Sequence, residues 1–275
     1  MLLLFPIAFA YNTRGAEVVR MIQSMTVAER CADAIRKSDR IVLLSGAGLS
    51  TSAGIPDFRG PNGIYRRKMK VDPERIFDID FFYSKPEFFY EFHREFLRAL
   101  DAVEPTFSHR FFARLEDDGK LSGVITQNID SLHQRAGSRN VLEIHGGIWS
   151  STCVSCRRSF DYETSKRKTF EENVPRCECG GVIKPDIVFF GENVKHLEQC
   201  QNLAHEADLM LVAGSSLVVT PAAYLPSMCE GTIVVVNKGE FSHSYLRADR
   251  ISIRAEEDID GFFREVGALL FPDLS

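Results

Sequence analysis

The chain has 275 residues, 44% of them hydrophobic and 26% charged, which is the ordinary balance of a globular protein with one large domain and a small appendage. The formal net charge of -5 argues against direct nucleic-acid binding, because such proteins need an excess of Lys and Arg to displace counterions. Seven cysteines are too few for a disulfide scaffold and indicate a reduced, cytoplasmic protein.

The first 25 residues are predicted to form a peripheral extension. Residues 2–11 are apolar, but they lack the positively charged flank of a signal peptide. They are also too short to span a bilayer, which takes about 20 residues. Thr26 is a suitable N-cap for a helix over 27–37, so the folded chain is expected to start there, with no membrane contact.

Short apolar runs alternate with amphipathic stretches along the rest of the chain. This pattern predicts strands at 40–44, 122–126, 141–144, 187–190, 209–213 and 233–236, with an edge strand at 249–254. It predicts helices at 27–37, 108–115, 197–207 and 259–270. Strands that alternate with helices indicate the α/β class, with a doubly wound parallel sheet.

An aromatic-rich insertion, 64–100, interrupts this alternation. Phe88, Phe92 and Phe96 recur at helical spacing and therefore mark one face of a helix. A packed face is favoured over a row of rings that stacks on a ligand.

Four cysteines stand at the spacing of a metal site. Cys153 and Cys156 form a Cys-x2-Cys pair, and Cys177 and Cys179 form a Cys-x-Cys pair further along. Four thiolates bind zinc tetrahedrally and leave no coordination position open, so a structural zinc ion is predicted. Two disulfides and unrelated buried thiols are the alternatives. A nucleic-acid-binding knuckle is disfavoured, because acidic residues between the pairs offset the local Lys and Arg.

A glycine-rich turn follows the first predicted strand. Gly46-Ala47-Gly48 can direct backbone N–H groups at a pyrophosphate, although the turn lacks the full dinucleotide fingerprint. A plain tight turn is the alternative. The loop that follows carries Asp57, Phe58 and Arg59 near the same end of the strand, which favours the phosphate site.

Polar residues also follow the second and third predicted strands. Gln127 and Asn128 suit ribose hydroxyls, and Asp130 suits an amide such as that of nicotinamide, although it is also a good helix cap. His145 is followed by two glycines, and its ordinary pKa of about 6.5 makes it a usable base. A structural role would be favoured for an isolated histidine. Because His145 is expected beside the other strand ends, a role as a catalytic base is favoured here.

Two later strands end in the same way, with Gly214-Ser215-Ser216 after one and Asn237 after the other. Because the carboxyl ends of parallel strands meet at one edge of a sheet, these residues predict a single crevice along that edge.

Together these motifs resemble those of the sirtuins, which are NAD-dependent protein deacylases, in a bacterial or archaeal-like form. The resemblance extends from about residue 27 to the end of the sequence. The matching residues are Gly46-Ala47-Gly48, Ser50, Gly54-Ile55-Pro56-Asp57-Phe58-Arg59, Thr126-Gln127-Asn128-Ile129-Asp130, His145-Gly146, the four cysteines, Phe189-Phe190-Gly191-Glu192 and Gly214-Ser215-Ser216.

The resemblance implies a Rossmann-like NAD-binding domain formed by 26–63, 101–150 and 185–275. A small domain would combine the helical insertion, 64–100, with the zinc module, 151–184. NAD as co-substrate and an acylated-lysine peptide or protein would meet between them.

The resemblance also implies the residue roles. His145 would act as the base, with Asn128 and Asp130 as the other catalytic residues. The NAD-binding residues would be Gly46, Ala47, Gly48, Asp57, Phe58, Arg59, Gln127, Asn128, Ile129, Asp130, Gly214, Ser215, Ser216 and Asn237. The peptide would add as a strand between the segment after Phe190-Gly191-Glu192 and the one near Leu217-Val218.

The implied reaction begins when the acyl oxygen attacks the ribose C1′ and nicotinamide leaves. It yields free lysine and O-acetyl-ADP-ribose. Relatives that remove charged acyl groups carry Tyr and Arg where this chain has His93 and Phe96, so uncharged acyl groups are expected here. A mono-ADP-ribosyltransferase and a non-enzymatic NAD-sensing module are the alternatives, while a hydride-transferring dehydrogenase is disfavoured by the incomplete fingerprint.

Overall fold

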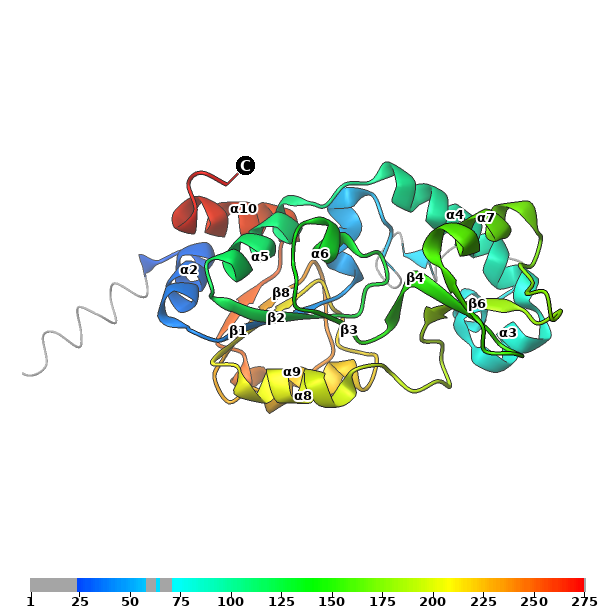
Figure 1. Cartoon of the computed structure of the whole chain (residues 1–275). Helices are drawn as coiled ribbons and strands as arrows, with labels where there is room; N and C mark the ends of the chain where they lie inside the picture. The colour runs from blue at the N-terminus through cyan, green and yellow to red at the C-terminus, as the bar shows by residue number, and fades with distance from the viewer. Residues whose placement is uncertain (1–23, 58–62, 65–70, 275) are drawn as a thin grey trace, which may run out of the picture.

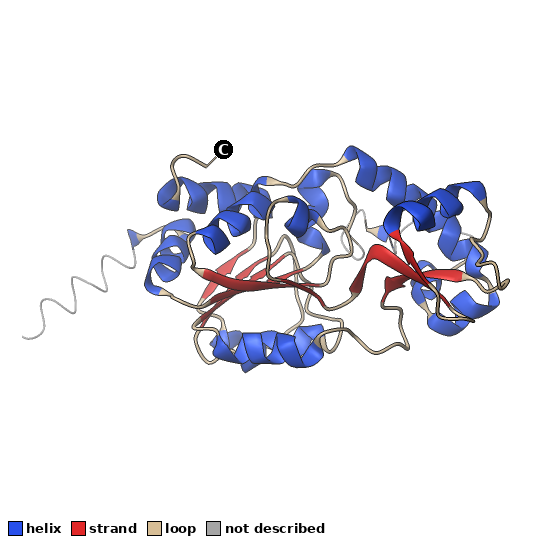
Figure 2. Ribbon diagram, viewed as in Figure 1, coloured by secondary structure: helices blue, strands red, loops and turns tan. Residues whose placement is uncertain are grey.

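The structure is a computed structural model that describes residues 24–57, 63–64 and 71–274 (Figure 1). Almost all of the predicted N-terminal extension, and the predicted site residues Phe58 and Arg59, lie outside this range. In the described part of the chain, two separate sheets are each accompanied by helices (Figure 2).

The larger sheet has six strands, all parallel, in the order β3-β2-β1-β7-β8-β9. Its strands are β1 (Ile41–Ser45), β2 (Leu121–Thr126), β3 (Val141–Glu143), β7 (Leu209–Ala213), β8 (Thr232–Val236) and β9 (Ile253–Ala255). Chain order runs outward from the centre in both directions, which confirms the predicted doubly wound topology.

Helices cover both faces of the larger sheet (Figures 1 and 2). One face carries α2 (Val27–Lys37), α5 (Phe107–Asp117), α6 (Leu132–Arg135) and α10 (Ile259–Leu270). The other carries α8 (Leu197–Glu206) and α9 (Leu225–Met228). The short 3₁₀ turns beside the sheet are η1 (Ala47–Ala53), η4 (Ala222–Tyr224) and η5 (Ala248–Arg250).

The central strands β1, β7 and β8 are almost entirely apolar because they are covered on both faces. Ile41 and Leu43 point into the core formed with α2, α5 and α10, whereas Val42 and Leu44 point into the core formed with α8 and α9. This alternation follows from the two-residue period of a strand. Burial on both faces explains why these strands are continuous hydrophobic runs in the sequence.

The smaller sheet is antiparallel, in the order β5-β4-β6. It comprises β4 (Gly146–Cys153), β5 (Ser159–Asp161) and β6 (Ile183–Ile187). It lies beside η3 (Pro73–Phe77), α3 (Ile79–Ser84), α4 (Pro86–Ala102) and α7 (Tyr162–Glu171) (Figure 1).

The aromatic insertion forms a packed core, as predicted. Phe92 and Phe96 of α4 are buried and stacked with their ring centroids 5.9 Å apart. Phe92 also meets Phe77 edge-on at 5.1 Å, and Phe82 meets Phe189 at 5.2 Å. Such edge-to-face contacts add to the stabilisation that burial provides.

Most predicted elements are confirmed within one or two residues, and α2, β7 and α10 have the predicted bounds. The capping box at Thr26 is also present: Thr26 Oγ1 accepts from Glu29 N at 3.1 Å, and Glu29 Oε2 accepts from Thr26 N at 2.7 Å.

Two predicted strands were misplaced. The strand predicted at 187–190 is β6, which runs from Ile183 to Ile187 and belongs to the antiparallel sheet. The strand was not recognised because it contains Lys184, and a buried lysine is rare. In the structure, Lys184 Nζ forms an ion pair with Glu192 at 2.8 Å. The edge strand predicted at 249–254 starts later, as β9, because residues 248–250 form the 3₁₀ turn η5.

Among the described residues, no helix combines the length and the apolar character needed to cross a membrane.

Candidate active site

The loops with the predicted site residues lie where the direction of the chain through the larger sheet reverses, between β1 and β7. Gly46 N donates to Ala213 O at 3.0 Å, and Gly48 N donates to Gly214 O at 2.9 Å. A Cβ on Gly48 would lie 2.8 Å from Gly214 Cα, so the two loops can approach this closely only as glycines. Ligands of doubly wound sheets bind at such a reversal point.

Asn128 and Asp130 are buried beside the glycine turn and are joined through Ser50. The Asn128 amide Nδ2 donates to Ser50 Oγ at 3.1 Å and to Gly46 O at 3.2 Å. Ser50 Oγ in turn donates to Asp130 Oδ2 at 2.7 Å. These bonds lock the loop after β2 against the loop after β1, so the polar groups of both loops occupy fixed positions.

The Asp130 carboxylate is fixed by two hydrogen bonds. Oδ1 accepts from Leu132 N, the first residue of α6, at 2.9 Å, and Oδ2 accepts from Ser50 Oγ. The N-cap position of α6 is held by Ser131, so Asp130 is not the helix cap that the sequence offered as an alternative. Burial raises the pKa of Asp130, and the hydrogen bonds from Ser50 and Leu132 oppose that rise. The carboxylate is therefore held rigidly in a desolvated place, which suits recognition of a polar ligand group.

His145 is oriented by the backbone of the neighbouring loop. Its Nδ1 lies 3.2 Å from Gln127 O, and a carbonyl can only accept, so Nδ1 carries the proton and Nε2 does not. Burial lowers the pKa of His145, and the bond to the Gln127 carbonyl partly opposes this. A neutral imidazole with a bare Nε2 is the form that accepts protons.

The predicted residues near β7 and β8 also gather at this edge. Gln127 Nε2 donates to Ser215 Oγ at 2.8 Å, which links the β2 loop to the β7 loop. Ser216 O accepts from Ser242 N, and Asn237 Nδ2 donates to Gly239 O at 3.1 Å.

The remaining predicted positions lie in the loops around this edge. Asp57 is half-buried and its carbonyl accepts from Ile64 N at 2.8 Å. Ala47 begins η1, and the Ile129 side chain packs into the aromatic core of the insertion. Phe58 and Arg59 fall outside the described residues.

Four polar residues at the site were not among the predicted site residues. Ser50 was noted in its motif, but its link to Asp130 was not foreseen. Ser45, Thr126 and His133 form a buried group behind Asn128. Ser45 and Thr126 end their strands, which is a usable signal, whereas a histidine in a short helix gives none.

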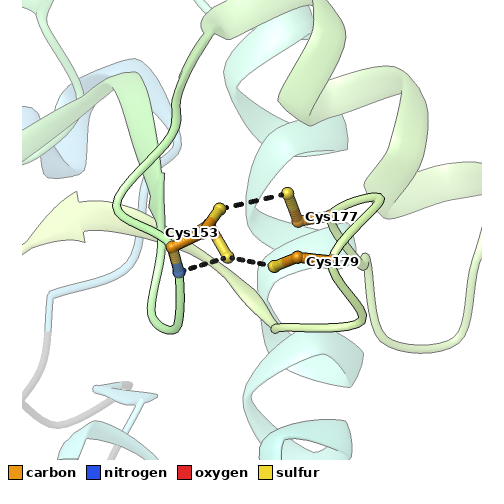
Figure 3. Close-up of side chains that lie close together, drawn as sticks. Cys153, Cys177 and Cys179 are labelled. Carbon is orange, nitrogen blue, oxygen red and sulfur yellow. Dashed lines mark hydrogen bonds between the residues drawn. The ribbon is translucent and has the colours of Figure 1, made fainter.

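The four predicted zinc ligands converge in the structure, and Figure 3 shows three of them, Cys153, Cys177 and Cys179, close together. The Sγ atoms of all four lie within 4.8 Å of one another. Cys153 Sγ lies 3.5 Å from Cys179 Sγ, and Cys156 Sγ lies 3.6 Å from Cys177 Sγ. A disulfide needs about 2.05 Å, so two disulfides are excluded. Four thiolates about 2.3 Å from a central zinc ion would stand roughly 3.8 Å apart, which fits these distances.

Gly180 and Gly181 shape the loop around the sulfur atoms. Gly180 has φ +86°, a conformation that favours glycine. A Cβ on Gly181 would lie 2.7 Å from Cys153 Sγ. The donor set is closed, with no place for a substrate, so the residues fit a structural zinc ion rather than a catalytic one.

The doubly wound sheet, the polar residues gathered at its strand ends and the separate four-cysteine cluster are the features of an α/β protein with a ligand site at the sheet edge and a structural metal site. Comparison with known proteins identifies the family. The family model described as "Sir2 family" matches residues 46–221. The chain belongs to the Sir2 family, whose members are the sirtuins.

Close relatives support this placement. The chain is 44% identical over 240 residues to a protein of Thermotoga maritima named "NAD-dependent protein deacetylase", covering 85% of this chain and 94% of that protein. It is 43% identical over 216 residues to a protein of the same name from Sulfurisphaera tokodaii, covering 77% and 85%.

Solved structures agree with these relatives. A Sir2 complex with deacetylated p53 peptide and 3′-O-acetyl ADP ribose superimposes with a TM-score of 0.81 at 42% identity, covering 88% of this chain and 97% of that one. A Sir2 complex with p53 peptide and NAD+ gives a TM-score of 0.79 at 41% identity, with coverage of 89% and 98%.

Proposed function

We infer that this protein is an NAD-dependent protein lysine deacetylase that releases nicotinamide, deacylated lysine and O-acetyl-ADP-ribose. The observation that carries this inference is the placement of His145, Asn128 and Asp130 together at the strand ends, in a chain 44% identical to a named deacetylase. NAD is a co-substrate, and the four cysteines hold a structural zinc ion.

We propose that the crevice holds NAD along the strand ends. Gly46, Ala47 and Gly48 would face the pyrophosphate with Asp57, Phe58 and Arg59 near the nicotinamide ribose. Gln127 and Asn128 would line the ribose, Ile129 would be a further NAD-binding residue, and Asp130 would accept from the nicotinamide amide. Gly214, Ser215, Ser216 and Asn237 would hold the adenosine. Fixed, desolvated polar groups suit this role, because they need no reorganisation when the ligand binds.

His145 would act as the general base. After the acyl oxygen has displaced nicotinamide, His145 Nε2 would remove a proton from a ribose hydroxyl, which then attacks the acyl carbon. The bond from Nδ1 to the Gln127 carbonyl supports this role, because it leaves Nε2 unprotonated. Asn128 and Asp130 would hold the ribose and the amide in register with this base.

The acylated peptide would bind as an added strand. Phe190 and Val218 are 40% and 48% exposed, unusual for large hydrophobic side chains. Val218 lies in one of the two segments between which the peptide is expected, and Phe190 begins the motif that precedes the other. Phe190 already forms a parallel bridge with Asp78, so the opposite edge of its segment would receive the peptide.

Uncharged acyl groups are the proposed substrates. His93 and Phe96 are buried among aromatic rings, and the His93 ring is stacked on Phe89 at 5.0 Å. Burial lowers the pKa of His93 to about 3, so this histidine offers no positive charge to an acidic acyl chain at neutral pH. Acetyl peptides are expected to be deacylated faster than malonyl or succinyl peptides in a direct comparison of kcat/KM; the reverse order would reject this proposal.

We further propose that residues 26–63, 101–150 and 185–275 form the NAD-binding domain, and that 64–100 and 151–184 form the small domain. The separation of the two sheets in Figure 2 supports this division. A cytoplasmic location is supported by the seven cysteines, all within the described residues and none in a disulfide. The net charge of -5 supports proteins rather than nucleic acids as partners.

The products distinguish the candidate functions. Purified protein incubated with NAD and an acetyl-lysine peptide is expected to give a peptide lighter by one acetyl group and an acetylated ADP-ribose, both visible by mass spectrometry. A peptide heavier by one ADP-ribose would identify a mono-ADP-ribosyltransferase instead. Unchanged NAD and peptide, with NAD still bound, would identify a non-enzymatic sensor.

A further inference from the structure

Two buried histidines lie directly behind the proposed catalytic loop and touch no ligand position. His133, in α6, and His109, in the first turn of α5, are both almost fully buried. Their rings are in contact, with centroids 4.8 Å apart and planes inclined at 63°. The proposed reaction gives neither of them a task.

His133 is connected to the site through two hydroxyl groups. Its Nε2 lies 2.9 Å from Ser45 Oγ, and Ser45 Oγ lies 2.9 Å from Thr126 Oγ1. Thr126 Oγ1 accepts from the backbone N–H of Asn128 at 3.1 Å. Ser45 and Thr126 are partners in the register of β1 and β2, so the two hydroxyls meet where both strands end.

On the side away from the site, His109 is hydrogen-bonded to the N-cap of α5. Its Nδ1 accepts from Thr106 N at 3.2 Å, as part of a capping box. A neutral imidazole has one donor and one acceptor nitrogen, so accepting at Nδ1 puts the ring proton on Nε2. The cap therefore determines the tautomer of His109.

Each ring has one buried nitrogen without a hydrogen-bond partner: His109 Nε2 and His133 Nδ1. Because Nδ1 of His109 accepts in the cap, Nε2 carries the ring proton and is a donor without an acceptor. If His133 Nδ1 is the acceptor, then His133 carries its proton on Nε2 and donates to Ser45 Oγ. Ser45 can then donate to Thr126 Oγ1, which also accepts from Asn128 N–H. Buried polar atoms are rarely left unpaired, which favours this matched assignment over two orphaned nitrogens.

We propose that His133 and His109 are positioning residues for the proposed deacetylase reaction. They form a hydrogen-bond network from the α5 cap to the Asn128 backbone. In this network, Thr106 N–H donates to His109 Nδ1, His133 Nε2–H donates to Ser45 Oγ, and Ser45 Oγ donates to Thr126 Oγ1, which also accepts from Asn128 N–H. The remaining link, from His109 Nε2–H to His133 Nδ1, joins two ring nitrogens that have no hydrogen bond in the structure, and it is the inferred part of this hydrogen-bond network. The network holds Asn128 and its neighbour Gln127, whose carbonyl orients His145. Burial also lowers the pKa of both histidines, which keeps them neutral at physiological pH.

The tautomers are tested directly by nitrogen NMR of the labelled full-length protein without substrate. The proposed hydrogen-bond network predicts that His109 and His133 both carry the proton on Nε2 near pH 7. A proton on Nδ1 of either ring, or a doubly protonated ring, would overturn it. This measurement needs no enzymatic activity, so it tests the tautomers of the hydrogen-bond network even if the deacetylase assignment fails.

Kinetic coupling tests the positioning role. Ser45→Ala and His133→Leu are each expected to lower kcat about tenfold, as expected when a buried hydrogen bond that orients reacting groups is lost, with little change in KM for the peptide. The double variant is expected to be no slower than the slower single variant, because both changes break the same hydrogen-bond network. Independent, multiplying effects would contradict the proposal, as would full kcat in either single variant.

Two further variants separate positioning from general stability. His133→Gln keeps an amide donor toward Ser45 and is expected to retain most of the kcat that His133→Leu loses. Ser138→Ala removes another buried hydroxyl that has no hydrogen-bond partner, next to α6, and is expected to leave kcat unchanged. If the kcat of all these variants simply followed their melting temperatures, the two histidines would be structural only, and the proposal would be rejected.

Discussion

Replacing His145 with alanine is expected to lower the rate of peptide deacetylation by about a hundred- to ten-thousand-fold, the usual contribution of a positioned general base. The bond from Nδ1 to the Gln127 carbonyl leaves Nε2 free to accept a proton, and no other described histidine offers this arrangement at the strand ends. NAD binding is expected to persist in the variant, because the proposed NAD contacts come from other residues.

The pH dependence of the wild-type activity should also reflect the role of His145 as general base. Burial lowers the pKa of His145 below its ordinary value of 6.5. The base is the neutral form, so it stays available at pH 6.5, and activity falls only as the pH drops through the lowered pKa. An acid limb centred above 6.5 would argue against His145 as the base.

A matched control for His145→Ala is His205→Ala, which removes an exposed histidine from α8. Initial rates with an acetyl-lysine peptide, together with NAD affinity from calorimetry, measure both variants. The control should match the wild type. If His145→Ala kept more than about a tenth of the wild-type rate, the assignment of a general base would be wrong.

Loss of the zinc ion is expected to abolish activity and to unfold the smaller sheet. Cys153→Ser removes a buried thiolate at the end of β4, and the three remaining sulfurs cannot close the tetrahedron. A structural zinc ion contributes about 10–16 kcal/mol of apparent binding free energy, which a small sheet of three strands cannot replace. The larger sheet has its own core and should keep its secondary structure.

Zinc content, activity and circular dichroism measured on the same samples test this expectation. Cys200→Ala is the matched control, because Cys200 is an equally buried cysteine on α8, in the core of the larger sheet and away from the sulfur cluster. The control should bind one zinc ion per chain and remain active. A Cys153→Ser protein without zinc but with full activity would show that the metal is dispensable.

Much of the fold follows from local sequence patterns. Strands such as β7 are buried on both faces, so they are uninterrupted apolar runs with polar residues at the carboxyl end. The cysteine spacing likewise predicted a cluster that the structure confirms. These features are local, and each of them is encoded within a few consecutive residues.

Features that depend on distant partners could not be predicted in the same way. Lys184 is buried in β6 only because Glu192 pairs with it, so the pattern around it did not resemble a strand. His133 reaches Ser45 across 88 positions of sequence. Nothing near His133 in the chain marks it as part of the site, because its partners come from two other elements.

In the proposed reaction, the acyl oxygen itself displaces nicotinamide from the ribose at the strand ends. This step is tested most directly with an acetyl-lysine peptide whose amide carbonyl oxygen is isotopically heavy, incubated with NAD and followed by mass spectrometry. We expect the heavy oxygen to be recovered in the acetylated ADP-ribose. Heavy oxygen recovered in free acetate, with unlabelled ADP-ribose or intact NAD, would contradict this proposal.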